Sequence, residues 1–97
     1  MAKGGWVYMT SDRYRGGIYT GVTSDLTARM HQHREGTGSQ FVRKYGFTRL
    51  VMVEGHARIE DAIAREKAVK KWRRAWKIEL IEAQNPAWDD LFESLNN

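Results

Sequence analysis

Two short runs of strand-favouring residues near the start of the chain constrain its fold most. Residues 6–11 and residues 18–22 are rich in Trp, Val, Tyr and Thr, and a polar segment ending in two consecutive glycines separates them. Such side chains favour a pleated sheet, and paired glycines favour a turn. The sequence therefore predicts a β-hairpin with Tyr8 on one strand and Tyr19 on the other. Gly21 weakens the second strand unless another group must approach it closely.

The next segment is typical of a helix that follows Ser24 as its N-cap. Leu26 and Met30 are the apolar anchors of this helix. Arg29 and His33 lie four residues apart, so they share one face. A pair of this kind most often lies on the protein surface, and the spacing alone does not assign it a function.

Residues 50–53 form a short apolar run, predicted as a third strand near the centre of the sheet. Residues 59–73 predict a helix whose apolar stripe includes one carboxylate, Glu66. A buried carboxylate needs a partner. Two alternatives are open: a cation such as Arg29 or Lys70 neutralises Glu66, or Glu66 faces a cleft and binds a hard metal cation through oxygen.

Residues 70–77 combine a dense run of bases with two tryptophans. Bases bind phosphates and exposed aromatic rings stack on nucleobases, but the four-residue spacing favours Trp72 and Trp76 as core anchors. A further helix is predicted from Trp76, and a last one with Asn85 as its cap and Pro86 at its first position. The residues predicted to bind nucleic acid are Arg43, Lys44, Lys70, Lys71, Arg73 and Arg74.

Charge divides the chain into a basic body and an acidic end. Residues 1–77 hold all 16 lysines and arginines and seven carboxylates, a net charge of +9, whereas residues 78–97 hold five carboxylates and no base, a net charge of −5. The basic body suggests a polyanionic partner, although an ordinary solvated surface explains the charge equally well. The acidic end leaves a third function open, a protein-interaction domain that uses the terminal helix.

Composition narrows the environment of the protein. The chain has no cysteine, which excludes disulfides and thiolate metal sites. Its first residues lead into only a short apolar run, too short for a signal peptide or a membrane span. We therefore expect a soluble cytoplasmic protein.

Taken together, these residues resemble the GIY-YIG nuclease superfamily. The likeness is closest to its small stand-alone bacterial members, which are similar to the catalytic domain of the excision-repair subunit UvrC. Trp6-Val7-Tyr8 matches the first motif, keeping only its tyrosine, and Tyr19-Thr20-Gly21 matches the second. The spacing of Arg29 and His33 matches the helix motif, and Glu66 matches the metal-binding glutamate.

The resemblance implies an α/β domain of α+β layers, with a small three-stranded sheet flanked by helices, over residues 1–97 with its core at about residues 5–95. It implies a metal-dependent endonuclease acting on DNA, with branched or damaged DNA in repair or recombination as the expected substrate. RNA and a protein partner that supplies specificity remain open. The alternative is a non-catalytic nucleic-acid-binding module, because many members carry an asparagine beyond the glutamate and the nearest one here is Asn85.

The same resemblance implies roles for five residues. Tyr8 is expected to act as general base on the attacking water with Tyr19 beside it. A free phenol has a pKa near 10, so the base needs nearby positive charge to act at neutral pH. Arg29 would stabilise the negative charge of the phosphorane, and His33 would orient the water or a tyrosine. Glu66 would hold Mg²⁺ or Mn²⁺ against the scissile phosphate.

Overall fold

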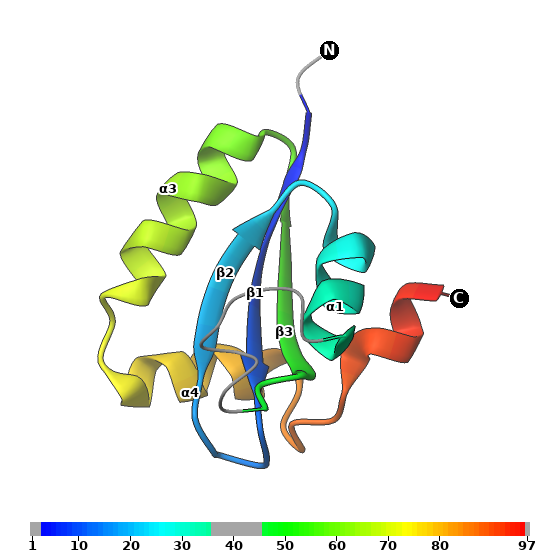
Figure 1. The fold of residues 1–97 in the computed structure, drawn as a ribbon. Coiled ribbons are helices and arrows are strands. Elements are labelled where there is room, and N and C mark those ends of the chain that lie inside the picture. The colour runs from blue at the N-terminus through cyan, green and yellow to red at the C-terminus, as the bar shows by residue number, and fades with distance from the viewer. Residues whose placement is uncertain (1–2, 36–45, 97) are drawn as a thin grey trace.

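The computed structural model of the protein describes residues 3–35 and 46–96. Two of the predicted nucleic-acid-binding residues, Arg43 and Lys44, lie outside the described residues. Figure 1 shows the elements, which are β1 (Gly5–Ser11), β2 (Tyr19–Thr23), α1 (Leu26–Glu35), β3 (Arg49–His56), α3 (Ile59–Lys70), α4 (Arg74–Gln84) and a 3-10 helix, η1 (Leu91–Asn96).

The three strands form one antiparallel sheet in the order β2-β1-β3. The predicted hairpin and the α+β class are therefore confirmed. In the hairpin, Tyr8 pairs with Gly21 and Thr10 pairs with Tyr19. Alternate residues of a strand share a face, so this register places Tyr8 and Tyr19 on the same face of the sheet, which the sequence alone left open.

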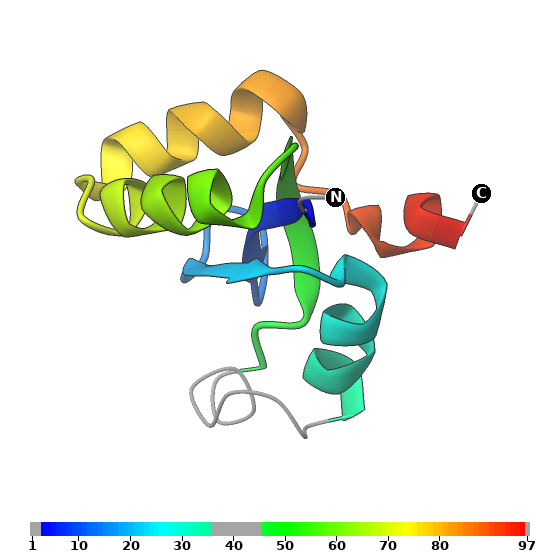
Figure 2. The ribbon, with the colours of Figure 1, turned by 90° about the horizontal axis from the view of Figure 1, so that it is seen from above.

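Helices cover both faces of the sheet (Figures 1 and 2), with α3 and α4 on one side and α1 with η1 on the other. The core under α3 and α4 consists of Val7, Met9, Val51, Met52, Ala62, Val69, Ile81 and Trp88. The core under α1 and η1 consists of Tyr8, Leu26, Met30 and Leu50. Tyr8 thus projects from the central strand into the α1 layer. Among the described residues, no helix is both long and apolar enough to cross a membrane.

The prediction that residues 50–53 form a central strand is wrong, because β1 occupies the centre and β3 lies at an edge. Side chains cover this edge. The Val53 N–H donates to Gln84 Oε1, and Gln84 Nε2 donates to the Val53 carbonyl, both over 2.9 Å. The Leu50 N–H donates to Asp90 Oδ1 over 3.2 Å. An edge strand covered in this way needs no polar side chains to limit unwanted pairing, so its sequence resembles that of a central strand.

Two predicted helix starts are wrong by a few residues. The N-cap of α1 is Asp25 and not Ser24, because the N–H of Ala28 donates to Asp25 Oδ1 over 3.1 Å. Asn85 caps the C-terminus of α4, where its N–H donates to the Ile81 carbonyl, and does not begin a helix at the following proline. Its side-chain amide donates to the Val51 carbonyl in β3 over 3.1 Å and to the Asp89 carbonyl over 2.8 Å.

The helix predicted over residues 59–73 ends at Lys70, and α4 begins at Arg74. The short break forms an elbow, visible in Figure 1 where α3 meets α4. The elbow separates the two tryptophans that the spacing predicted as core anchors. Trp72 is half-buried and packs against the core, but Trp76 is 46% exposed. The prediction that Trp76 belongs to the core is therefore wrong.

Candidate active site

A direct contact between a tyrosine of β1 and a histidine of α1 lies at the centre of the site. Tyr8 is 1% exposed and His33 is 2% exposed. The Tyr8 hydroxyl lies 3.3 Å from His33 Nε2, and the two rings meet edge to face with their centroids 5.6 Å apart. In the tautomer with its proton on Nδ1, the imidazole accepts a hydrogen bond at Nε2 and the phenol is the donor.

Tyr19 and Arg29 complete the cluster around this contact. The Tyr19 ring centroid lies 6.3 Å from that of Tyr8 and 5.6 Å from that of His33. Arg29 is half-buried on the same helix as His33, and its charge acts on both Tyr8 and His33. The hairpin and α1 therefore bring together four of the five residues that the sequence singled out.

Burial controls the protonation of this pair. Burial raises the pKa of Tyr8 above its ordinary value of 10, and the neighbouring Tyr19 raises this pKa further, while the charge of Arg29 lowers it only in part. Burial and then Arg29 lower the pKa of His33 below 6.5, and the backbone of Phe47 opposes this shift. At neutral pH the phenol therefore keeps its proton and the imidazole is uncharged, so one ring nitrogen of His33 carries a lone pair.

The lowered pKa of His33 predicts a pH-dependent stability. The unfolded chain takes up a proton at this histidine near pH 6.5, whereas folded His33 resists it. Folding stability is therefore complete above that pH and falls as the pH drops below it. We expect the decrease in unfolding free energy between about pH 7.5 and about pH 5.5 to be smaller in His33→Gln than in the wild type. Chemical denaturation at the two pH values measures this difference.

His31→Gln is the matched control, because His31 lies two residues earlier on α1 and is exposed beside Phe92. This variant should keep the pH dependence of the wild type. An equal reduction in both variants would show that burial of His33 does not cause the effect.

Gly21 makes room for the Tyr8 ring. A Cβ atom at Gly21 would lie 2.4 Å from the Tyr8 hydroxyl oxygen and 2.5 Å from the ring carbon that bears it. Both distances are far below van der Waals contact, so only glycine fits opposite Tyr8 in this register. The glycine that weakens the predicted strand is thus required by the close approach of the phenol.

We expect Gly21→Ala to displace Tyr8, to lower the unfolding free energy by about 1–3 kcal/mol, as overpacking typically does, and to reduce activity. Denaturant unfolding measures the first effect and a cleavage assay the second. Gly55→Ala is the control, since a Cβ there meets the edge of the Trp6 ring at 3.0 Å, away from the site. If Gly55→Ala lost as much activity, the displacement of Tyr8 would not be the cause.

Glu66 approaches the cluster from α3. It is 9% exposed, its charge raises the pKa of Tyr8, and Lys70 Nζ lies 3.6 Å from its Oε1 atom. Of the partners that the sequence left open, the lysine one turn later is the one in place. Lys70 also lines a hollow of about 360 Å³ together with Ile18, Tyr19, Thr20 and Lys77. The hollow lies beside the edge strand β2, with Tyr19 and the last residue of α3, Lys70, in its lining.

The described side chains can bind a hard cation in only one type of site. Among residues 3–35 and 46–96, no group of three or more His, Cys, Asp or Glu side chains is arranged to hold a metal. Glu66 supplies a single carboxylate. Mg²⁺ commonly binds through one or two carboxylates and takes its other ligands from water and substrate phosphates. Glu66 therefore suits Mg²⁺ or Mn²⁺ in a site that the substrate completes.

The remaining predicted binding residues lie at the elbow and fall into two groups. Lys71 and Arg73 are exposed there. Arg74 donates to the backbone carbonyls of Arg15 and Gly16 over 2.6 and 2.8 Å, so it holds α4 to the β1–β2 turn. Lys77 was not among the predicted binding residues. It reaches the hollow because the chain bends at the elbow, a few residues before the helix boundary that the sequence predicted near Trp76.

Comparison with known proteins gives a consistent picture. The sequence model of the GIY-YIG catalytic domain matches residues 4–79. A UPF0213 protein of Clostridium perfringens is 30% identical over 79 residues, which cover 81% of this chain and 85% of that protein. UPF0213 proteins of Staphylococcus aureus strains Mu3 and N315 are each 31% identical over 67 residues, covering 69% of this chain and 82% of theirs. No solved structure gives a significant match.

Proposed function

The chain belongs to the GIY-YIG catalytic domain family, and on that basis we propose that it is a metal-dependent endonuclease that hydrolyses DNA phosphodiester bonds. Membership of this family shows that the chain has a nuclease-type domain. The single observation that supports catalysis by this chain is the buried contact of 3.3 Å between the Tyr8 hydroxyl and His33 Nε2. This contact places a phenol and an uncharged imidazole, two groups that can pass a proton, at the centre of the cluster.

In the proposed reaction, Tyr8 and His33 pass a proton in sequence. The attacking water gives a proton to Tyr8 Oη as the phenol gives its own to His33 Nε2. The water oxygen bonds to phosphorus, the bond to the leaving sugar oxygen breaks, and that oxygen takes a proton from solvent. His33 then releases its proton to solvent, which restores the uncharged imidazole. This relay explains how Tyr8 serves as a base although its pKa is raised, because the phenol never has to lose its proton before the attack.

Positive charge near the relay suits the substrate. Arg29 stabilises the charge that develops on the phosphoryl oxygens, since its guanidinium already acts on both Tyr8 and His33. Lys70 and Lys77 offer two ammonium groups in the hollow beside Tyr19, where neighbouring phosphates of the strand would lie. A Mg²⁺ or Mn²⁺ ion held by Glu66 would neutralise phosphate charge as a Lewis acid.

The wider role that we propose is cleavage of branched or damaged DNA in repair or recombination. In this proposal, specificity comes from DNA shape or from a protein partner. Two of the five carboxylates at the acidic end pair within the described chain, Glu82 with Arg15 and Asp90 with Arg34.

A second candidate function is nucleic-acid binding without catalysis. One observation favours it: Asn85 is 5% exposed and its side chain is bonded to the backbone near β3, so it adds nothing to the site. Such a module would bind DNA with an affinity that falls with salt by about 0.9 log units per phosphate contact and per log unit of salt.

Cleavage of a labelled branched junction and of its linear duplex arms separates the two functions. We expect the purified protein to cut the junction in Mg²⁺ or Mn²⁺ and to stop when EDTA is added. A labelled RNA of the same sequence tests the nucleic-acid class. Salt-sensitive binding without any cut strand in either metal would favour the binding module.

A further inference from the structure

The elbow between α3 and α4 carries a second hollow. It is separate from the group of Tyr8, Tyr19, Arg29 and His33, called here the tyrosine cluster. It has a volume of about 360 Å³ and is lined by Trp72, Trp76, Glu79 and Leu80. The two indoles meet edge to face, with centroids 6.1 Å apart and planes at 83°. Trp72 is anchored against the core, while Trp76 is 46% exposed. The hollow is thus an aromatic corner formed by two indole rings, of which the Trp72 ring is fixed against the core.

Three basic side chains lie around this corner. The guanidinium carbon of Arg65 lies 5.0 Å from the centroid of Trp72, and that of Arg73 lies 4.9 Å from the centroid of Trp76. Arg65 is ion-paired with Glu54 at 3.0 Å. Lys71 is exposed between Arg65 and Arg73 in the sequence. Within the part of the chain that the structure describes, neither Lys71 nor Arg73 forms an ion pair. These two cations are therefore available to an anionic ligand.

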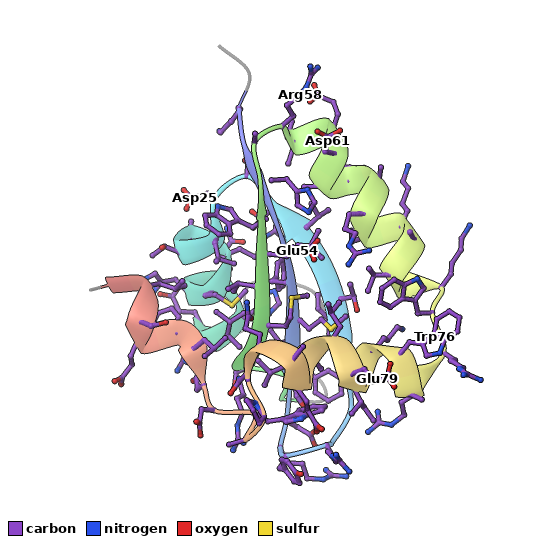
Figure 3. The ribbon with its side chains drawn as sticks, turned by 180° about the vertical axis from the view of Figure 1, so that it is seen from behind. Asp25, Glu54, Arg58, Asp61, Trp76 and Glu79 are labelled. Atoms are coloured by element: carbon purple, nitrogen blue, oxygen red, sulfur yellow. The ribbon has the colours of Figure 1, made fainter. Side chains whose placement is uncertain are left out.

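One carboxylate lies in the hollow itself. Glu79 is exposed on α4 and, like Lys71, forms no ion pair with any described residue. Figure 3 shows Glu79 and Trp76 on the end of α4 that meets α3. A carboxylate repels phosphate, so the anionic part of a ligand lies outside the hollow. The same carboxylate accepts hydrogen bonds from an exocyclic amine, as in the pairing of Glu with cytosine N4.

These features together favour a nucleobase as the ligand of the hollow. An indole face stacks on a base, and a neighbouring guanidinium strengthens that contact. A base inside a duplex is covered on both faces by its neighbours, so only an unpaired base can enter. We propose that the α3–α4 elbow binds an unpaired nucleobase bearing an exocyclic amine, stacked on the exposed tryptophan, with its flanking phosphates on Lys71 and Arg73.

This inference rests on the proposed function and adds a substrate class to it: nucleic acid with an unpaired stretch beside the cleavage site. Lys70 connects the two regions, because it precedes the elbow in the chain and its ammonium lines the hollow next to Tyr19. A strand that places an unpaired base on the elbow would continue past Lys70 toward the tyrosine cluster.

Fluorescence anisotropy with short labelled oligonucleotides tests the site. Oligo-dC and oligo-dT are titrated with the full chain at low salt in EDTA, so that no cleavage contributes. Loss of one stacked base corresponds to about 1–3 kcal/mol, and we therefore expect Trp76→Leu to weaken oligo-dC binding by roughly tenfold or more. Trp6→Leu is the matched control, because Trp6 is 40% exposed on β1, away from the elbow, and it should bind as the wild type does.

A second variant tests the carboxylate. The wild type should bind oligo-dC more tightly than oligo-dT, and Glu79→Gln should reduce this preference while Glu93→Gln, on η1, keeps it. The proposal is overturned if no oligonucleotide binds, if Trp76→Leu binds like the wild type, if both tryptophan variants lose affinity equally, or if Glu79→Gln keeps the full preference. Because cleavage plays no part in this assay, an inactive protein that shows the Trp76 and Glu79 effects would overturn the proposed nuclease and not the binding site.

Discussion

Replacing Tyr8 by phenylalanine is expected to slow DNA cleavage by about 10²–10⁴-fold, the contribution typical of a positioned acid–base group. Phenylalanine keeps the ring that packs over Gly21 and removes only the hydroxyl that lies 3.3 Å from His33 Nε2. The relay then has no group to accept the proton of the attacking water. Single-turnover cleavage of a labelled junction measures the loss, and thermal unfolding of the same preparation verifies the fold.

Tyr14→Phe is the matched control for this variant. Tyr14 is 53% exposed in the β1–β2 turn, and its ring meets Trp88 at 6.1 Å, outside the tyrosine cluster. Removing its hydroxyl should leave cleavage unchanged. A Tyr8→Phe protein that cleaves as fast as Tyr14→Phe would exclude Tyr8 from the proton transfer.

The second large effect is expected from Glu66→Gln. The amide matches the carboxylate in size but carries no charge, so it binds a divalent cation far less well. Because Lewis-acid stabilisation amounts to several kcal/mol, we expect the rate at a fixed metal concentration to fall roughly 10³-fold. Binding of DNA in EDTA should survive or improve, since loss of the carboxylate frees Lys70 from its ion pair at 3.6 Å. Cleavage rates over a Mg²⁺ and Mn²⁺ titration measure the effect.

Glu60→Gln serves as the control, because Glu60 lies in the first turn of the same helix and its side chain is 65% exposed. Its metal dependence should match that of the wild type. The metal-binding role of Glu66 would be wrong if Glu66→Gln kept the rate and the metal dependence of Glu60→Gln.

Local sequence patterns predicted which helices and strands form. They predicted less well which of these elements lie beside one another. The hairpin was predictable because strand-favouring side chains flank two glycines. The place of β3 was not, because an apolar run has the same composition at the centre of a sheet and at an edge. Here Gln84 replaces the missing neighbour strand by bonding both backbone groups of Val53, and no pattern within residues 50–53 indicates a partner so far along the chain.

The tyrosine cluster illustrates a similar limit. The sequence singled out five residues through their resemblance to family motifs, and all five lie in the stretch that the family model matches: Tyr8, Tyr19, Arg29, His33 and Glu66. Their chemistry depends on contacts between elements. Neither the pairing of Tyr8 with Gly21 nor the burial that reverses the expected pKa shift of Tyr8 follows from residue spacing. The register of β1 and β2 determines the pairing of Tyr8 with Gly21. The packing of α1 on the sheet determines the burial of Tyr8.

Trp76 shows how a helix break can overturn a spacing argument. Residues four apart share a face only while they belong to one helix. The chain leaves the helix between Lys70 and Arg74, so Trp72 remains at the core and Trp76 turns outward. The residues of that break are ordinary helix-compatible side chains, so propensity does not fix where the first helix ends.

Nicking of supercoiled plasmid by the wild type and by a Tyr8→Phe, Glu66→Gln double variant, purified in parallel, is the most direct test that this chain is itself a nuclease. The wild type should convert the plasmid to open circles in Mg²⁺ or Mn²⁺, and the double variant should leave it supercoiled at the same protein concentration. Equal nicking by both proteins would trace the activity to a contaminant or to other residues, and no nicking by a wild type that still binds DNA would contradict the proposed catalysis.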